Sequence, residues 1–526
     1  MDASLSRKFY VSCILFLLLP ALIFLLGWVR PEISLPLALA GGVFLWRWLR
    51  TLDYPIIPFG ENRRTLLRAF ALTFLWVFAS GIGGYTYQNY DHYNRNAILR
   101  DLTMRSWPVR CEEMTIPEAA SPEIRPTLVY YSGFFLMPAL GGKAALWLGG
   151  SQAAAMNAAF FLCFLEALFA VYATYLLISQ WLGRFALWPL IFLIGFSGWD
   201  LIPYLLFFRP EVEGPEMLSV TARLGAFFGT HNAPHLEWFT HPWLNSSMTG
   251  LLFWVFNQSV PFLLGMMLFQ TLRDWRGLLL VYAALFISAP FPSAGLFPLM
   301  AWQLLKNSNF QLPAVLRTLC SPLNLLSLPA IALIAAYYQG NVSCGVTHFW
   351  FPESAHLWLL FSVYFLTEYV VWFVCVGRKW DAELFICLLL LLVTSFFKLG
   401  GGSDFAMRTA IPCFAYLMLC VLRNWYSETT TCRTRILILG IFLIGCANPL
   451  MEFKRCAGNT LLTYAGLLQG SKSVAFSASP EFPDPDYYVR DERIHSIFEL
   501  RDLKDPFWEN FTGQSDSTFF RYLARK

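Results

Sequence analysis

Long apolar stretches recur along the chain from Phe9 to about residue 451, and short polar connections separate most of them. An apolar stretch of about 20 residues is long enough to cross the hydrocarbon core of a bilayer as a helix. The pattern predicts thirteen such helices, and the pair around Pro290 and Pro292 is alternatively a single re-entrant element. The predicted spans are 9–29, 33–50, 66–86, 153–179, 185–207, 246–271, 277–290, 293–306, 322–338, 356–377, 382–398, 407–423 and 435–451.

Composition strengthens the membrane assignment. Hydrophobic residues make up 57% of the 526 positions and charged residues only 14%, against about 25% charged residues in a soluble domain. The surface must therefore face lipid, and we expect an all-α, polytopic transmembrane helix bundle. The net charge of +4 is small and dispersed, so nucleic acid is not expected as a partner.

Lysine and arginine positions orient the predicted bundle, because these residues are enriched in cytoplasmic loops. Arg7 and Lys8 precede the first apolar run, which lacks a small-residue cleavage site and resembles a signal anchor. With the N-terminus inside, every inner loop is basic, whereas the short outer loops hold only Arg30, Lys398 and Arg408. We therefore expect a cytoplasmic N-terminus and an extracytoplasmic C-terminus. The bacterial inner membrane is favoured over the endoplasmic reticulum, because no retention signal ends the sequence.

The same alternation places three long polar segments outside, at 86–152, 208–244 and 452–526. The membrane domain is expected to cover residues 1–451. The remaining segment, 452–526, is predicted to lie outside the membrane, either as a small exported domain or as an irregular cap.

The first external loop is the most informative of these segments. Asp91 follows the third predicted helix directly, so its carboxylate is expected at the membrane surface, where it meets both a lipid-borne phosphate and a water-side acceptor. An aspartate at this place is alternatively a solvated interface residue. After it come, in order, Ile98, Arg100, Trp107, Pro126-x-Leu128-x-Tyr130-Tyr131 and Leu140-Gly141-Gly142.

This order of residues resembles the first external loop of the GT-C glycosyltransferases, membrane enzymes that use polyprenyl-phosphate sugars. They include protein O-mannosyltransferases and lipid A aminoarabinose transferases. The resemblance implies paired interfacial helices in the later part of the loop. It also implies transfer of a sugar from a polyprenyl-phosphate carrier to a lipid, glycan or protein acceptor on the extracytoplasmic face. In the family the aspartate at the head of the loop is the catalytic acidic residue, a role that falls here on Asp91.

Two features depart from the family. His92 stands where a companion acidic residue is often found, which leaves the need for a divalent metal ion open. Two additional helices precede the loop. The chemistry itself is consistent with Asp91 as general base, because an inverting displacement needs one carboxylate to take the acceptor proton.

The lipid phosphate requires cationic and hydrogen-bonding stabilisation. Lys398, Asp404 and Arg408 flank a glycine-rich connection at 400–403, whose backbone amides are free to approach a phosphate. These three residues and Arg100 are the predicted lipid-phosphate group. A helix-connecting turn with a solvated ion pair is the alternative interpretation of the same residues.

A second polar group is predicted to position the acceptor or the sugar. Histidines and an acidic residue cluster before the sixth predicted span, and they are alternatively metal ligands. Asp200 lies near the outer end of the fifth span. It either helps to position the acceptor or caps a break in the helix, and the sequence favours neither role. The predicted positioning residues are Asp101, Asp200, His231, His235, Glu237 and Trp238.

Glu166, Gln258 and Glu368 fall within apolar runs, where polar groups are costly. They are expected to face a cavity or a partner, and helix–helix hydrogen bonding is the simpler assignment. A transporter or flippase for lipid-linked sugars, or a polysaccharide polymerase or ligase, remains the alternative to a glycosyltransferase.

Overall fold

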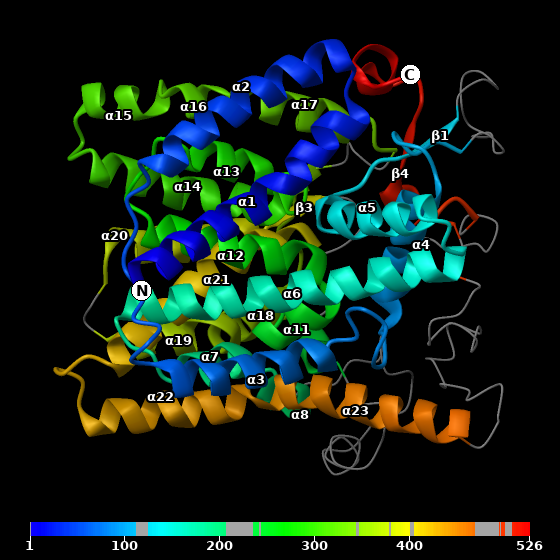
Figure 1. Ribbon diagram of the computed structural model, residues 1–526. Coiled ribbons are helices and arrows are strands. Elements are labelled where there is room, and N and C mark those ends of the chain that lie inside the picture. The colour runs from blue at the N-terminus through cyan, green and yellow to red at the C-terminus, as the bar shows by residue number, and fades with distance from the viewer. Residues whose placement is uncertain are drawn as a thin grey trace.

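The computed structural model describes residues 2–111, 125–206, 235–240, 243–342, 347–377, 380–399, 404–468, 494, 496–499 and 508–526. These parts of the chain are mostly helical (Figure 1). The helices are α1 (Asp2–Trp28), α2 (Pro31–Arg50), α3 (Arg63–Ala79), α4 (Tyr90–Met104), α5 (Gly133–Trp147), α6 (Gln152–Leu182), α7 (Trp188–Gly195), α8 (Leu201–Leu206), α11 (Met248–Trp254), α12 (Phe256–Thr271), α13 (Leu278–Leu285), α14 (Pro290–Asn307), α15 (Leu312–Leu319), α16 (Pro322–Leu325), α17 (Ser327–Tyr338), α18 (Ala355–Phe365), α19 (Val371–Cys375), α20 (Ala382–Thr394), α21 (Asp404–Trp425), α22 (Cys432–Gly445) and α23 (Ala447–Leu468).

The described residues contain five helices that are long and apolar enough to cross a membrane, or six if the bent pair α15 and α16–α17 counts as one. They are Asp2–Trp28, Gln152–Leu182, Ala355–Cys375, Asp404–Trp425 and Cys432–Leu462. The chain is therefore an all-α membrane protein with several long apolar helices, and the thirteen predicted spans are not confirmed.

Breaks within the apolar stretches account for much of this difference. The stretch 185–207 forms α7 and α8, which are separated at Phe196–Asp200, and the stretch 246–271 forms α11 and α12. Around Pro290 the chain forms two helices, α13 and α14, with proline in the first turn of α14. Hydropathy averaged over a window does not report such breaks.

The expected boundary at residue 451 lies inside α23, which continues to Leu468. Among the described residues of the C-terminal segment, β4 (Thr512–Gln514) pairs antiparallel with β1 (Pro126–Leu128) of the first loop. The backbone N–H of Arg30 donates to the carbonyl of Leu523 at 2.9 Å. This part of the C-terminal segment therefore packs on the first loop and on the connection between α1 and α2.

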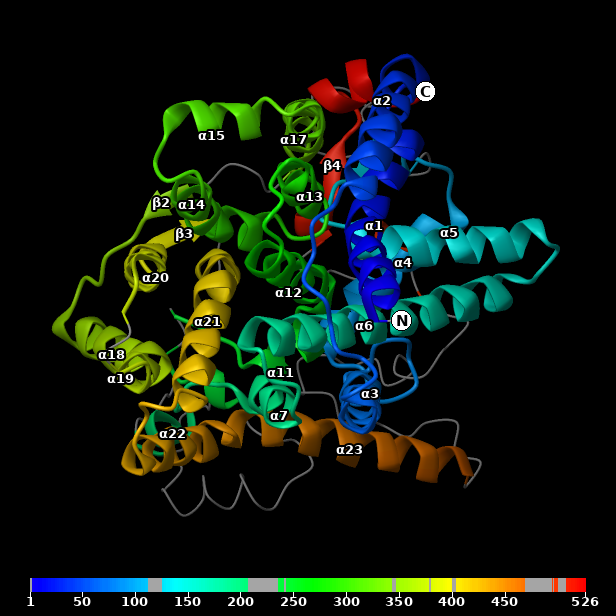
Figure 2. The ribbon, with the colours of Figure 1, turned by 60° about the vertical axis from the view of Figure 1, so that its left-hand side comes forward.

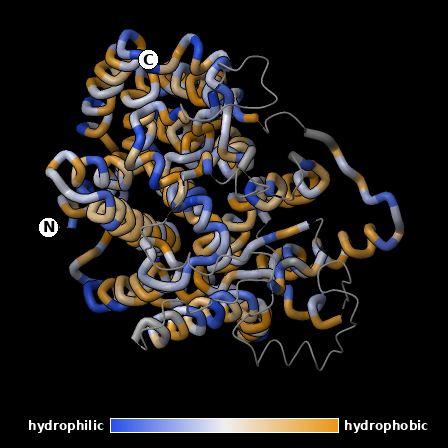
Figure 3. Tube along the Cα trace, turned by 90° about the vertical axis from the view of Figure 1, so that its right-hand side faces the viewer, coloured by the Kyte–Doolittle hydropathy of each residue, from blue (hydrophilic) through white to orange (hydrophobic). Residues whose placement is uncertain are grey.

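Helices α6 and α22–α23 run across the width of the molecule, and α4, α5 and the β1–β4 pair gather at one end (Figure 1). Figure 2 shows α1 crossing α6 at a steep angle. Apolar residues run along most helices (Figure 3), and many large ones are exposed, such as Leu39 at 71% and Leu75 at 60%. An apolar surface on this scale suits lipid.

A second short sheet joins β2 (Thr347–Phe349) to β3 (Phe397–Leu399) in antiparallel register.

Candidate functional site

Helix α4 begins with a side-chain cap that places Asp91 in its first turn. The side-chain oxygen of Asn89 accepts a hydrogen bond from the Asp91 backbone N–H at 3.2 Å. The Asn89 amide also donates to the carbonyl of Phe253 at 2.7 Å, which ties the helix start to α11. A carboxylate at a helix N-terminus is stabilised by the helix dipole.

The Asp91 carboxylate forms an ion pair with Arg95 one turn later, at 2.8 Å between Oδ2 and Nη2. The Asp91 side chain is 37% exposed, whereas that of Arg95 is only 5% exposed. The Arg95 guanidinium lies 5.1 Å from the ring centre of Phe256. Its Nε and Nη1 atoms are buried without a hydrogen-bond partner, so Arg95 retains unused donors.

The start of α21 repeats this arrangement. Arg408 pairs with Asp404 at 2.7 Å, and again the aspartate is exposed, at 58%, and the arginine buried, at 9%. Arg408 Nη1 donates to the hydroxyl of Tyr131. Its Nε is buried without a partner.

Tyr130 and Tyr131 join the two ion pairs, with ring centres 3.7 Å apart. Burial and Tyr131 raise the pKa of Tyr130 well above its usual value, and the charges of Arg95 and Arg408 oppose that rise. The Asp91 carboxylate interacts electrostatically with Arg408. We call the six residues Asp91, Arg95, Tyr130, Tyr131, Asp404 and Arg408 the arginine–tyrosine cluster.

His92, which replaces the companion acid expected from the family, packs inside the protein. Its ring stacks on Phe256 at 4.9 Å between centres. Burial and the charge of Arg95 lower the pKa of His92 to about 3, so the imidazole is neutral at pH 7. In the described parts of the chain, no group of three or more His, Cys, Asp or Glu side chains is placed to hold a metal ion.

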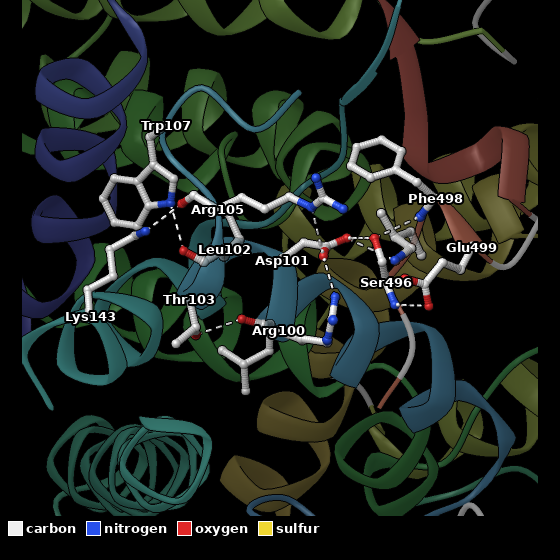
Figure 4. A network of polar contacts seen from close by, with 12 residues as sticks. Arg100, Asp101, Leu102, Thr103, Arg105, Trp107, Lys143, Ser496, Phe498 and Glu499 are labelled. Carbon is white, nitrogen blue, oxygen red and sulfur yellow. Dashed lines mark hydrogen bonds and ion pairs between the residues drawn. The ribbon is translucent and has the colours of Figure 1, made fainter. Parts of the chain in front are cut away.

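Asp101 lies on the same helix but belongs to a different network (Figure 4). Its fully buried carboxylate accepts hydrogen bonds from Arg100 at 3.1 Å and Arg105 at 3.3 Å. It also accepts from the hydroxyl of Ser496 at 2.7 Å and the backbone N–H of Ile497 at 2.9 Å. Burial raises the pKa of Asp101 above its usual value. Asp101 therefore binds the C-terminal segment to α4, and Arg100 pairs with Asp101.

Asp200 and Glu237 meet at Asn448 of α23. The Asn448 amide donates to Asp200 Oδ2 at 3.0 Å and to Glu237 Oε2 at 3.2 Å. Burial and the charges of Glu452 and Asp200 raise the pKa of Glu237 to about 8. Asp200 and Glu237 are thus joined through Asn448, a residue that the sequence analysis did not single out.

Two further buried carboxylates extend this group. Glu368 accepts a hydrogen bond from Asn245 at 2.9 Å and interacts electrostatically with Asp200. Glu452 pairs with Arg455 at 2.6 Å and accepts from the Trp254 indole at 2.9 Å. We call Asp200, Glu237, Glu368 and Glu452 the carboxylate cluster.

The remaining predicted residues belong to neither the arginine–tyrosine cluster nor the carboxylate cluster. His235 makes an edge contact with Trp254 at 5.1 Å between ring centres, and Trp238 ends the short helix Leu236–Trp238. His231 lies outside the described residues, as does the connection 400–403. The Lys398 ammonium lies 4.0 Å from the Trp350 ring centre, on the β2–β3 sheet.

The structure thus brings together Asp91, Asp404 and Arg408 from the first turns of α4 and α21. It places Arg100 with Asp101 instead. Sequence reasoning missed Arg95, although its spacing of four residues from Asp91 on a predicted helix indicates an ion pair. It also missed Glu452 and Asn448, which only tertiary packing brings to Glu237. In comparisons with known proteins, no family model, no curated protein and no solved structure matches the chain.

Proposed function

We propose that this protein is an integral membrane glycosyltransferase that moves a sugar from a polyprenyl-phosphate carrier to an acceptor, by inversion at the anomeric carbon. The resemblance of the first loop to the GT-C enzymes motivates this proposal. The observation that carries it is the arginine–tyrosine cluster, in which two exposed carboxylates stand beside two buried guanidinium groups with unused donors.

Each part of the cluster has a place in this chemistry. The Asp91 carboxylate takes the proton of the acceptor hydroxyl as the new glycosidic bond forms. Arg408 and Arg95 donate to the phosphate oxygens of the leaving group, where charge-assisted hydrogen bonds stabilise the developing negative charge. The exposure of Asp91 keeps its carboxylate accessible to an acceptor from the water side.

The extracytoplasmic position of this cluster and the bacterial inner membrane are parts of the same proposal. They are supported by the basic inner loops in the sequence. A lipid, glycan or protein is the acceptor class, and membrane lipids surround the helices. No step of the proposal uses a metal ion.

The test is transfer by the purified full-length protein, with a panel of polyprenyl-phosphate sugars as donors. Asp91→Asn is expected to lower turnover by about 10²–10⁴-fold, the usual contribution of a general base. The variant is expected to fold with a somewhat lower melting temperature, because the buried Arg95 loses its counter-charge. Asp516→Asn, the same substitution in the C-terminal segment, is the control. Undiminished turnover of Asp91→Asn, or no turnover of the wild type with any donor, contradicts the proposal.

The carboxylate cluster favours a second candidate, a proton-coupled transporter or flippase for lipid-linked sugars. Four buried carboxylates surround the break between α7 and α8 and the π-helical turn at Leu366–Val370. Broken helices and buried acids occur at ion sites of transporters. Translocation of a polyprenyl-phosphate sugar across proteoliposomes, driven by a pH gradient and without sugar transfer, would favour this function over the first.

A further inference from the structure

Several polar side chains of α12, α14 and α21 are buried without any hydrogen-bond partner. Both amide atoms of Gln258 are in this state, as are the hydroxyl oxygens of Ser293 and Thr409. Gln258 and Ser293 are 0% exposed and Thr409 is 4% exposed. A buried polar group without a partner is costly, so such a set requires water or a ligand to satisfy it.

These residues come from three helices that pack against one another, namely α12, α14 and α21. A Cβ on Gly295 would lie 2.1 Å from the carbonyl oxygen of Thr409, so the backbones of α14 and α21 touch beside Ser293. Thr409 directly follows Arg408, whose Nε is also unpartnered.

The start of α12 reaches the same place through residues 131–135. Phe134 packs on Phe256, two residues before Gln258, with ring centres 5.3 Å apart. The Gly133 N–H donates to the carbonyl of Ile287 at 3.0 Å, in the turn that leads into α14. Tyr131, two residues before Gly133, binds Arg408. One short segment therefore contacts the start of α12, the turn before α14 and the start of α21.

We propose that Gln258, Ser293 and Thr409 form a subsite for the uncharged, hydroxyl-bearing sugar of the donor, next to the arginines that hold its phosphate. This inference rests on the proposed function. An amide and two hydroxyls each donate and accept, as sugar hydroxyls do. The three side chains carry no charge, so they suit a neutral hexose better than an amino sugar or a uronic acid, whose charge would lack a counter-ion among them.

The test compares three probes on the purified full-length protein: bare polyprenyl phosphate, the same lipid with a neutral hexose, and the same lipid with an amino hexose. Wild type is expected to bind the neutral-hexose lipid more tightly than the other two. Gln258→Leu is expected to keep its affinity for bare polyprenyl phosphate and to lose about tenfold in affinity for the hexose form. Gln270→Leu, the same substitution at the far end of α12, is expected to change neither.

The melting temperature separates a binding role from a structural one. Because Gln258→Leu removes an amide without partners, it is expected to leave the melting temperature of the free protein unchanged or higher. Gln258→Leu could instead lower the melting temperature and still bind the hexose lipid more tightly than bare polyprenyl phosphate, by the same factor as wild type. Gln258 would then hold a bound water only, and the subsite would be overturned. Equal or tighter binding of the amino hexose by wild type also overturns it. Failure of bare polyprenyl phosphate to bind wild type instead contradicts the proposed function.

Discussion

The carboxylate of Asp101 accepts a 2.7 Å hydrogen bond from the hydroxyl of Ser496, which lies 395 positions further along the chain. Asp101 sits on α4, the helix whose first turns carry Asp91 and Arg95. The phenyl ring of Phe498 lies 5.5 Å from the Arg105 guanidinium in the same network. The C-terminal segment therefore helps to fix the helix that carries the proposed catalytic carboxylate.

Asp101→Asn is expected to destabilise the protein by about 1–3 kcal/mol, the usual cost of losing a hydrogen-bond acceptor in a buried network. An asparagine keeps one acceptor oxygen, but it leaves Arg100 and Arg105 without their counter-charge and places an NH₂ group near other donors. Thermal unfolding in detergent measures the effect. The partly exposed Asp516→Asn serves as the control, and equal melting temperatures for both variants would refute the structural role of Asp101.

Glu237 is expected to make stability depend on pH. Its pKa is about 8 in the folded protein and near 4.5 when unfolded, so between these values the folded state binds more protons. The free energy of unfolding therefore falls as pH rises from about 4.5 to about 8. The total change is several kcal/mol, since one pKa unit corresponds to about 1.4 kcal/mol.

Glu237→Gln is expected to flatten this dependence and to be more stable than wild type at pH 9. Denaturant unfolding followed by tryptophan fluorescence over pH 4.5–9 measures both. Glu428→Gln, on an exposed turn, should keep the wild-type profile. A profile of Glu237→Gln that matches wild type would place the titration on another group.

Arg408→Lys is expected to weaken binding of polyprenyl phosphate by about 10–100-fold. A lysine keeps the charge but loses the planar set of donors that contacts Asp404 and Tyr131 while leaving Nε for a phosphate. Binding is measured with fluorescent short-chain polyprenyl phosphate. Arg433→Lys, on the exposed start of α22, is the control and should bind polyprenyl phosphate like wild type. If Arg408→Lys also binds like wild type, Arg408 does not bind the phosphate.

Gly198→Ala is expected to destabilise the protein by about 1–3 kcal/mol, the usual cost of forced overpacking. A Cβ at this position would lie 2.2 Å from Oε2 of Glu368, so the carboxylate would have to move from Asn245. Gly440→Ala is the matched control, because nothing lies within 4 Å of the added atom. Thermal unfolding of both variants is the measurement. Adding Glu368→Asp should recover part of the lost stability. If the double variant is as unstable as Gly198→Ala alone, the added methyl group clashes with a group other than the Glu368 carboxylate.

The sequence by itself determined that this is a helical membrane protein, because hydropathy is a local property and lipid demands apolar residues wherever the chain faces it. It also indicated Asp91, Asp404 and Arg408, since charged residues next to apolar spans stand out. It could not show that α7 and α8 are separate helices, or that α23 passes residue 451, because averaged hydropathy does not report breaks or helix ends.

Only the tertiary structure decided which polar residues meet. Arg95 and Arg408 are 313 positions apart, and Asp101 bonds to Ser496 instead of joining Asp91 on the same helix. The pairing of Glu237 with Asn448 likewise depends on how α23 packs against α11. Such long-range contacts depend on the packing of whole helices, and neither spacing nor composition within one segment encodes them.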